Sequence, residues 1–536
     1  MVPTRFRRVL RTSAVAVASL AVGLVGTAAT TTADAQTAPA AAGAAAAAAQ
    51  AKASGKVQEP GVTASLWEWN WRSVAAECPR LDRAGYDGVQ VAPPQDSVKR
   101  TSLGNGSDTV LHPWWEVYQV VDYHLTSRMG GEAEFRSMVS ACRKAGVKVY
   151  VDAVINHTTG QGNTSYGGKS YTPYTYPDIP YVPNDFHVKV GACRSSDGGI
   201  SDFNSKTEVH NCNLVGLEDL RTDTTKVQAT LAAYLNKLLS YGVSGFRVDA
   251  AKHIAPADLD AIYARLGKTK DGKRPYWTLE VGPGSPGALS PQAYTKSGDV
   301  LGLDAAQQIF KAFKSYETSD NFGDISGLST FGADSGLTKS SKTMSFVTNH
   351  DADRSPNDFL GHKDGAQYLL ATEWLLADGY GSPQVYSSFD FGTDTAQSPP
   401  SDANGLITDT SCTNGQWTCD HSKHAVVSMV RFHQYVKGSG KRHVYDDDFN
   451  VLAFSRGSKG WAGFNNNATP DDKSGSGERT ITVQTGLKKG TYCDIISGGK
   501  AAGGCSGEAI KVRASGKATV TLPARGAVAF TKKDRR

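Results

Sequence analysis

The chain repeats one unit along its first half: an amphipathic helix that ends at a glycine and is followed at once by a short apolar strand. Three examples are helix 73–84 with strand 88–91, helix 132–145 with strand 147–154, and helix 224–241 with strand 245–248. Short connections between helices and strands predict parallel strands covered by helices. A (β/α)8 TIM barrel fits a chain of 536 residues best, and such a barrel carries its chemistry at the C-terminal ends of its strands.

Two segments depart from this unit. Residues 157–219 hold few helix signals and many Gly, Tyr, Pro and Ser residues, so we expect a small irregular domain inserted after the third barrel strand. Beyond about residue 440, apolar side chains recur at every second position between clusters of Gly, Ser and Asp. That pattern predicts an antiparallel β-sandwich. We therefore expect a catalytic barrel over 58–440, which contains the insertion, and a C-terminal β-domain over 441–536.

The N-terminal segment is typical of an exported protein. Residues 1–35 have a basic start, an apolar stretch and a small-residue cleavage site at 33–35, as a signal peptide does. The pair Arg7-Arg8 leaves twin-arginine export open beside ordinary secretion. The alanine-rich residues that follow cannot form an amphipathic face, so we expect a disordered propeptide or tether over 36–57. With no later stretch of ~20 apolar residues, we expect a secreted, extracellular protein with no membrane partner.

The charge of the chain excludes one large class of partner. The formal charge of +5 falls to about +2 without residues 1–35, which hold four arginines and one aspartate. Basic residues are dense only at 532–536, where a short solvated tail explains them. Binding to nucleic acid needs a larger positive excess gathered on one face. We therefore expect no nucleic-acid partner.

Polar side chains follow four of the apolar strands. They are Asn156 and His157, then Asp249, then Glu280, and finally Asn349, His350 and Asp351. Because the carboxyl ends of barrel strands meet at one mouth, Asp249, Glu280 and Asp351 are expected to converge. Any one of these carboxylates alone could be a surface group or a helix cap. Together they predict glycoside cleavage, which needs one ionised and one protonated carboxyl in a partly desolvated cleft.

These four strand-end segments resemble the conserved regions of the α-amylase family of glycoside hydrolases in their order, their spacing and the identity of their residues. The resemblance extends from about residue 62 to 530 and is strongest to the animal-type branch, as found in secreting bacteria. It implies that Asp249 is the nucleophile, Glu280 the general acid/base, and Asp351 the residue that stabilises the distorted sugar. It also implies that Arg247 keeps Asp249 ionised by a charge-assisted hydrogen bond.

The same resemblance assigns residues to the substrate. His157 and His350 would bind sugar hydroxyls beside the scissile bond, although each histidine alone would more often be structural. The aromatic segment 112–119 has two interpretations, a plug of the core or a carbohydrate platform. The resemblance favours the platform, which would consist of Trp114, Trp115, Tyr118 and Gln119. It assigns Lys252, His253 and Leu214 to substrate binding as well, the first two on the aglycone side.

Ion binding is also implied by the resemblance. A structural calcium ion would be held by the side chains of Asn156 and Asp219 and by the backbone carbonyls of His210 and His253, an oxygen-rich shell of the kind calcium prefers. Animal-type relatives also bind chloride. Two of the three chloride positions are matched here by Arg247 and Asn349, but the third, an arginine in the relatives, is Gln384. We therefore expect no chloride requirement.

Eight cysteines in an exported chain are candidates for disulfides, yet spacing alone admits 105 pairings. The resemblance implies three pairs, Cys193–Cys212, Cys412–Cys419 and Cys493–Cys505. Cys78 and Cys142 remain, each inside a predicted helix. Because those two helices are neighbours, we expect the fourth disulfide between them.

The expected function is calcium-dependent endo-hydrolysis of α-1,4-glucosidic bonds in starch, glycogen and malto-oligosaccharides by a monomer. An exo-acting α-glucosidase or transglycosylase on the same scaffold is the main alternative, because the catalytic trio would be the same. A binding protein that has lost its chemistry is the other alternative. It would need a change in Asp249, Glu280 or Asp351, and all three are present.

Overall fold

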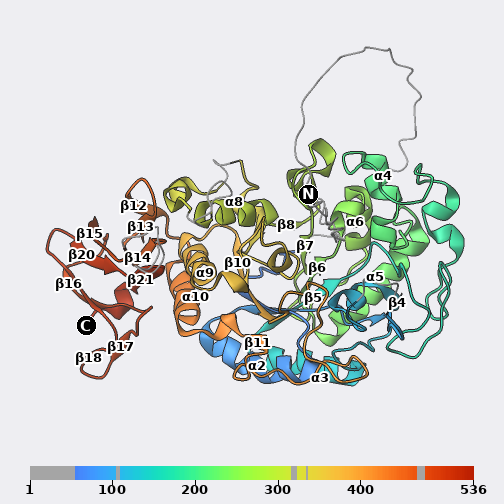
Figure 1. Cartoon of the computed structure of the whole chain (residues 1–536), viewed down its shortest axis with the longest axis horizontal. Coiled ribbons are helices and arrows are strands. Elements are labelled where there is room, and N and C mark those ends of the chain that lie inside the picture. Colours follow the sequence, from blue (N-terminus) through green and yellow to red (C-terminus); the bar gives the residue numbers. More distant parts are fainter. Residues whose placement is uncertain (1–54, 104–108, 315–322, 333–335, 468–476) are drawn as a thin grey trace, which may run out of the picture.

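The structure is a computed structural model that describes residues 55–103, 109–314, 323–332, 336–467 and 477–536 (Figure 1). The signal peptide expected at 1–35 and most of the expected tether, residues 36–54, lie outside the described residues. Within the described part of the chain, no helix is long and apolar enough to cross a membrane.

Eight parallel strands form a closed barrel. In order around the barrel they are β1 (Thr63–Leu66), β2 (Gly88–Val91), β5 (Lys148–Ala153), β6 (Gly245–Val248), β7 (Tyr276–Leu279), β8 (Asp299–Leu301), β9 (Thr343–Ser345) and β10 (Ser382–Phe389). The last strand pairs in parallel with the first, with Thr63 opposite Gln384, and this pairing closes the barrel. The short strand β11 (Trp417–Thr418) adds antiparallel to the end of β10.

Local capping chemistry explains the ends of two of the barrel helices. Helix α2 (Trp71–Ala84) begins after Asn70, whose side chain accepts a hydrogen bond from the backbone of Ser73, and it ends at Gly85 with φ 97°. Helix α5 (Thr225–Tyr241) ends at Gly242 with φ 114°. The others are α3 (Glu132–Lys144), α6 (Pro256–Ala264), α7 (Pro291–Tyr294), α8 (Leu303–Phe313), α9 (Ala366–Asp378) and α10 (His424–Val436).

The segment between β5 and α5 contains the predicted insertion. Apart from the six-residue helix α4 (Lys206–Asn211), residues 157–219 form turns, 3-10 helices and isolated bridges. Figure 1 shows this segment, coloured cyan to green, at the end of the molecule opposite the C-terminal domain. A small hairpin of β3 (Asp96–Ser97) and β4 (Val120–Asp122) connects to it through a bridge between Val98 and Ser165.

The C-terminal residues form antiparallel sheets. The main sheet has the order β12 (Lys441–Asp446), β13 (Val451–Arg456), β14 (Gly460–Asn465) and β21 (Gly526–Thr531). Two-stranded sheets are made by β15 (Arg479–Gln484) with β20 (Lys517–Leu522), β16 (Gly490–Cys493) with β19 (Ala509–Val512), and β17 (Lys500–Ala501) with β18 (Gly504–Cys505). Buried apolar side chains such as Trp461, Ile481 and Phe530 form a core shared by the main sheet and the first two of these pairs. The predicted fold class is confirmed.

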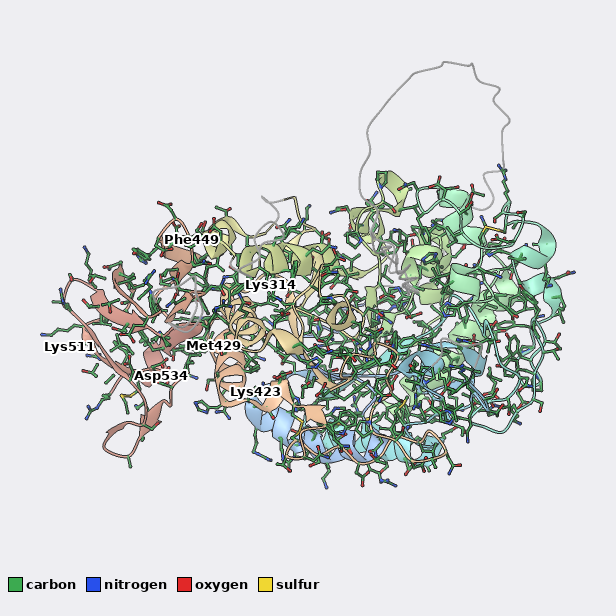
Figure 2. All side chains as sticks on the ribbon, in the orientation of Figure 1. Lys314, Lys423, Met429, Phe449, Lys511 and Asp534 are labelled. Carbon is green, nitrogen blue, oxygen red and sulfur yellow. A yellow bond between two sulfur atoms is a disulfide. The ribbon has the colours of Figure 1, made fainter. Side chains whose placement is uncertain are left out.

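The C-terminal domain joins the barrel through the end of α9. The guanidinium of Arg456 donates to the carbonyls of Ala377 and Asp378, and the carboxylate of Asp378 pairs with Lys441. These contacts satisfy carbonyls that the last turn of a helix leaves without partners. Figure 2 shows side chains on both sides of this boundary, with Met429 on α10 and Phe449 and Asp534 in the C-terminal domain.

The described residues contain four disulfides, and they are the four that the sequence led us to expect. They join Cys78–Cys142, Cys193–Cys212, Cys412–Cys419 and Cys493–Cys505. The first links α2 to α3 over a Cα–Cα distance of 5.0 Å, within the range that a disulfide spans.

The barrel begins slightly earlier in the chain than residue 58, where the sequence analysis placed the boundary with the tether. The carbonyl of Lys56 accepts from the backbone N–H of Arg274 over 2.9 Å, and the N–H of Gln58 donates to the carbonyl of Arg274 over 2.8 Å. Val57 between them bridges to the same residue. Residues 56 and 57 therefore pair with the segment before β7 and do not belong to a tether.

Candidate active site

The three candidate carboxylates and Arg247 all lie at the C-terminal mouth of the barrel. Arg247 is on β6 and Asp249 directly follows that strand. Glu280 follows β7, and Asp351 lies six residues beyond the last residue of β9. In a parallel barrel these strand ends share one rim, so distant parts of the chain meet there.

One guanidinium connects three carboxyl groups at this rim. Nη1 of Arg247 lies 2.7 Å from Oδ1 of Asp249 and 2.7 Å from Oδ1 of Asp152, and Nη2 lies 2.5 Å from Oε1 of Glu280. The side chain of Arg247 is only 2% exposed, whereas those of Asp249 and Glu280 are 11% and 19% exposed. The two candidate catalytic carboxyls are thus held side by side and open partly toward the mouth.

The residue after Asp249 orients Glu280 from the other side. Ala250 has φ 47°, in the left-handed region that a non-glycine residue seldom adopts. Its backbone N–H donates to Oε2 of Glu280 over 2.8 Å. Local backbone strain of this kind is concentrated at functional sites. Glu280 is therefore fixed at both oxygens, by Arg247 and by Ala250.

The protonation of this cluster differs from the sequence-based expectation that Arg247 simply keeps Asp249 ionised. Burial raises the pKa of Asp249 well above the ordinary value of an aspartate, and Arg247 only opposes the rise. Burial likewise raises the pKa of Asp152, to about 6. A single guanidinium cannot neutralise three carboxylates in a low-dielectric site. Burial therefore favours the protonated form of Asp249 and Asp152 in the substrate-free protein.

Aromatic rings orient the residues on the opposite wall. The ring of His350 stacks on Trp67 at 4.8 Å and on Tyr118 at 5.3 Å between centroids. Its Nε2 lies 2.9 Å from the hydroxyl of Tyr118 and 3.4 Å from Oδ2 of Asp351. Burial lowers the pKa of His350 well below the usual value, so the ring is neutral and can exchange hydrogen bonds with hydroxyl groups. Asp351, whose pKa burial raises, is 33% exposed and is the most accessible of the candidate carboxyls.

His157 lies on the same side as Asp249. Its Nε2 is 3.1 Å from the carbonyl of Tyr118 and 3.9 Å from Oδ2 of Asp249. Burial lowers the pKa of His157 to about 4, so it is neutral. Its contact with a sugar hydroxyl remains a prediction, because Nε2 already has a partner in the protein.

The expected platform has a buried end and a half-buried end. Tyr118 is 7% exposed and Gln119 is 6% exposed, and the side-chain oxygen of Gln119 accepts from the backbone of Gly160 over 2.9 Å. Trp114 and Trp115 are half-buried, on the 3-10 helix η1 (Trp114–Tyr118). The sequence left a core plug and a sugar platform open. The two tryptophans remain partly accessible to solvent, whereas Tyr118 and Gln119 are buried.

The residues expected on the aglycone side lie where the insertion meets the barrel. Lys252 donates to the hydroxyl of Ser285 over 2.8 Å, and burial lowers the pKa of this lysine. His253 donates from Nδ1 to the carbonyl of Val209 on α4 over 3.0 Å. Leu214 is half-buried and precedes Val215, which is 73% exposed.

Two of the expected calcium ligands, Asp219 and Asn156, lie side by side and fit the ion. Asp219 is 1% exposed, its Oδ2 lies 2.6 Å from Nδ1 of His187, and its Oδ1 is buried with no hydrogen-bond partner among the described residues. A backbone bond from Leu220 to the carbonyl of Asn156 holds Asn156 beside it. His210 lies in the last turn of α4, where helix carbonyls have no intrahelical partner. An orphaned carboxylate oxygen with amide and carbonyl oxygens nearby is a set that calcium would satisfy.

A second group of possible metal ligands lies elsewhere, in the part of the chain that the structure describes. Ligand atoms of Asp122, His124 and Asp178 lie within 4.8 Å of one another. Lys169 already pairs with Asp178 over 2.6 Å, so this group has a cation of its own. It is distinct from the expected calcium ligands.

Arg247, Asn349 and Gln384 are the positions that match the chloride site of the relatives. Among the described residues, no hydrogen bond connects any two of them. Gln384 lies on β10 and donates from Nε2 to Oε1 of Gln90 over 2.9 Å. The side-chain oxygen of Asn349 accepts from the backbone of Asp351 and Ala352. The guanidinium of Arg247 forms ion pairs with the three carboxyls described above.

Three residues of the site were not assigned from the sequence. Asp152, an aspartate inside a buried strand, was the one with a recognisable signal, because burial of a carboxylate requires a partner. Trp67 stacks on His350 and donates to the hydroxyl of Tyr118 over 3.1 Å. Arg354 packs against Trp67 and donates to the carbonyl of His350. Such ring stacking has no signature in a single sequence.

Comparison with known proteins agrees with this geometry. Residues 79–274 match the family described as "Alpha amylase, catalytic domain", and residues 442–533 match "Alpha amylase, C-terminal all-beta domain". An alpha-amylase of Thermomonospora curvata is 41% identical over 88% of this chain and 73% of its own, and one of Tenebrio molitor is 36% identical over 85% and 93%. The crystal structure of alpha-amylase I from Eisenia fetida is 33% identical, with a TM-score of 0.81 over 89% of this chain and 98% of its own. A mutant of that earthworm protein has been solved with maltohexaose.

Proposed function

The chain belongs to the α-amylase family of glycoside hydrolases, and on that premise we propose that it hydrolyses internal α-1,4-glucosidic bonds of starch, glycogen and malto-oligosaccharides with retention of configuration. The observation that carries the proposal is the pair of hydrogen bonds by which Arg247 holds Asp249 and Glu280 together. Retaining enzymes need two carboxyls about 5–5.5 Å apart, close enough for one to attack and the other to protonate.

In the first step, Glu280 donates its proton to the glycosidic oxygen while Asp249 attacks the anomeric carbon from the opposite face. The C–O bond to the leaving chain breaks and a covalent glycosyl ester on Asp249 forms. The guanidinium of Arg247 holds the two carboxyls together. The resemblance to the family assigns the proton to Glu280 and the ionised role to Asp249. In the second step, Glu280 removes a proton from water, and the hydroxide oxygen displaces Asp249 with a second inversion.

Asp351 and His350 act on the sugar itself. The partly exposed carboxylate of Asp351, next to His350, would stabilise the positive charge that develops on the sugar ring. Neutral His350 and His157 would bind sugar hydroxyls, which supplies binding that strengthens as the ring distorts. Trp114 and Trp115 would cover apolar faces of neighbouring glucose units.

The half-buried tryptophans favour endo-cleavage over the exo-acting alternative. An exo-enzyme closes its site around one chain end, whereas a partly exposed aromatic platform can accept a chain that continues past it. Trp114 and Trp115 are both half-buried, and the ring of Trp114 lies 5.7 Å from the ring of His350. We therefore prefer an endo-amylase to an α-glucosidase or transglycosylase.

Calcium, localisation and assembly complete the proposal. When bound, calcium would hold the insertion against the barrel through Asn156, Asp219 and the carbonyls of His210 and His253, and chloride would not be needed. Four disulfides and the leader-like start of the sequence support secretion. We propose a monomer with no nucleic-acid or membrane partner, consistent with its small net charge.

The function is tested by following amylose digestion with two readouts at once. Endo-cleavage lowers iodine staining early, when few new reducing ends have formed. Exo-cleavage releases glucose or maltose first and leaves the staining high for the same number of reducing ends. A protein with the Asp249→Asn substitution controls for contaminating activity. No release of reducing ends by the parent protein would contradict the function altogether.

A further inference from the structure

Arg354 occupies a central position beside the candidate site, although nothing in the chemistry above uses it. It ends the 3-10 helix η10 (Ala352–Arg354), three residues after Asp351. Its Nη1 donates to the carbonyl of His350 over 2.7 Å, and its Nε donates to the carbonyl of Thr395 over 3.0 Å. The side chain therefore joins the segment after β9 to the loop after β10.

Four aromatic rings surround the same guanidinium. Its carbon lies 4.7 Å from the ring centroid of Trp67, 5.0 Å from Trp114, 5.4 Å from Phe389 and 4.5 Å from Phe391. All four distances are within the range of a cation–π interaction, which gains strength where water is excluded. These rings come from the end of β1, from η1 and from the end of β10. Arg354 thus binds three separate parts of the rim together.

The contacts of Arg354 lead to the groups that would touch the sugar. The ring of Trp67 stacks on that of His350 with 4.8 Å between centroids, and the centroid of the Trp114 ring lies 5.7 Å from that of His350. Trp114 also donates from Nε1 to the carbonyl of Thr395 over 2.8 Å, so that carbonyl accepts from Trp114 and from Arg354. Loss of the guanidinium would release His350 and the tryptophan platform at the same time.

We propose that Arg354 is a positioning residue of the hydrolysis, which fixes His350, Asp351 and Trp114 around the reacting sugar and supplies positive charge beside Asp351. The inference rests on the proposed function and adds a specific residue to it. Arg354 touches no reacting atom. It acts through the backbone of His350, through the ring stack and through its field.

The charge of Arg354 has a defined direction of effect. The charges that shift the pKa of Asp351 are those of Arg247 and Arg354, and those that shift the pKa of His350 are the same two arginines and Glu280. His350 and Asp351 also face each other at 3.4 Å, and the hydroxyl of Tyr118 lies 2.9 Å from Nε2 of His350. Arg354 opposes the burial that raises the pKa of Asp351, and it adds to the burial that lowers the pKa of His350. Removing its charge would raise both pKa values. If activity needs an ionised Asp351 and a neutral His350, the acid limb of the pH–rate profile would move to higher pH.

The test compares Arg354→Met and Arg354→Lys with a matched control, Arg274→Met. Arg274 is buried, whereas Arg354 is half-buried. Like Arg354, Arg274 donates to two backbone carbonyls, those of Leu266 and Tyr263, and lies over an aromatic ring, 4.3 Å from that of Tyr263. It precedes β7, at the opposite end of the barrel from the site. Starch turnover by the parent protein is measured first, so failure of the proposed function is recognised before the variants are compared.

Arg354→Met is expected to lower kcat on maltohexaose about 10-fold to 100-fold, as small misplacements at a reacting centre do, and to move the acid limb upward. Arg354→Lys keeps the positive charge but loses the planar guanidinium that donates to two carbonyls. We therefore expect kcat to fall while the acid limb of the pH–rate profile stays in place. Arg274→Met lowers the melting temperature without changing either property per folded molecule. Parent-like kcat in Arg354→Met overturns the inference, as does a loss of activity that only follows the loss of folded protein. If the methionine variant does not fold, parent-like kcat in Arg354→Lys overturns it.

Discussion

Nη2 of Arg247 lies 2.5 Å from Oε1 of Glu280, although the two residues belong to different strands and are separated by 33 positions. The same arginine binds Asp249 through Nη1. One buried cation therefore links the proposed nucleophile with the proposed acid. This arrangement explains why the carboxyls can lie close together, because the cation offsets part of their mutual repulsion.

Glu280→Gln is expected to abolish turnover while oligosaccharide binding stays nearly intact. The amide keeps the shape and can still accept from Arg247, but it cannot give a proton to the leaving oxygen. Loss of a general acid typically lowers the rate about 10²–10⁴-fold. The measurement is kcat on maltohexaose together with its dissociation constant by calorimetry. A variant that keeps more than a tenth of the parent kcat would remove Glu280 from this role.

The sequence predicted the scaffold well because its signals are local. Helix α5 ends at Gly242, and β6 covers 245–248, as the periodicity and the glycine predict. The rim residues were found because polar groups at strand ends are unusual. Contacts such as the packing of Arg354 on Trp67 could not be predicted, because they join β1, β9 and β10 through side-chain packing that a single sequence does not encode. The pKa of Asp249 also depends on burial, which only the folded chain defines.

Asp219→Asn is expected to remove the stabilisation by calcium. The substitution replaces one of the two buried carboxylate oxygens, either Oδ1, which has no hydrogen-bond partner among the described residues, or Oδ2, by an amide nitrogen that cannot bind a cation. A ligand at 100 times its dissociation constant stabilises the folded state by about 2.7 kcal/mol. The parent melting temperature should therefore rise when calcium is added after chelation, and that of the variant should not.

Asp178→Asn is the matched control for this experiment. Asp178 belongs to the other acidic group, with Asp122 and His124. If that variant loses the response to calcium while Asp219→Asn keeps it, the calcium site has been placed on the wrong residues.

Glu68→Gln is expected to become more stable than the parent as the pH rises. Glu68 is fully buried, neither of its carboxyl oxygens has a hydrogen-bond partner among the described residues, and burial raises its pKa from 4.5 to about 8. Between these values the folded state binds a proton that the unfolded state has lost, so the free energy of unfolding falls with rising pH, by up to about 1.4 kcal/mol per pH unit. Glutamine does not titrate. Melting temperatures from pH 5 to pH 9 should diverge in its favour, and parallel curves would contradict the raised pKa.

Replacement of chloride by gluconate at constant ionic strength is expected to leave kcat unchanged. An arginine with bound chloride carries no net charge, and neutral Gln384, held by Gln90, gives the same sum without an anion. The field at Glu280 can therefore be similar in both cases. A several-fold fall in kcat that millimolar chloride restores would show that a chloride site exists.

The most direct test of the proposed mechanism is the configuration of the reducing ends that form first. Proton NMR during the first minutes of maltohexaose cleavage, before mutarotation mixes the anomers, distinguishes the α from the β hydroxyl. The proposed mechanism has two displacements at the anomeric carbon, the first by Asp249 and the second by water, both assisted by Glu280. Two inversions restore the original configuration, so the α anomer should appear first. Initial formation of the β anomer would mean a single displacement by water and would contradict the account.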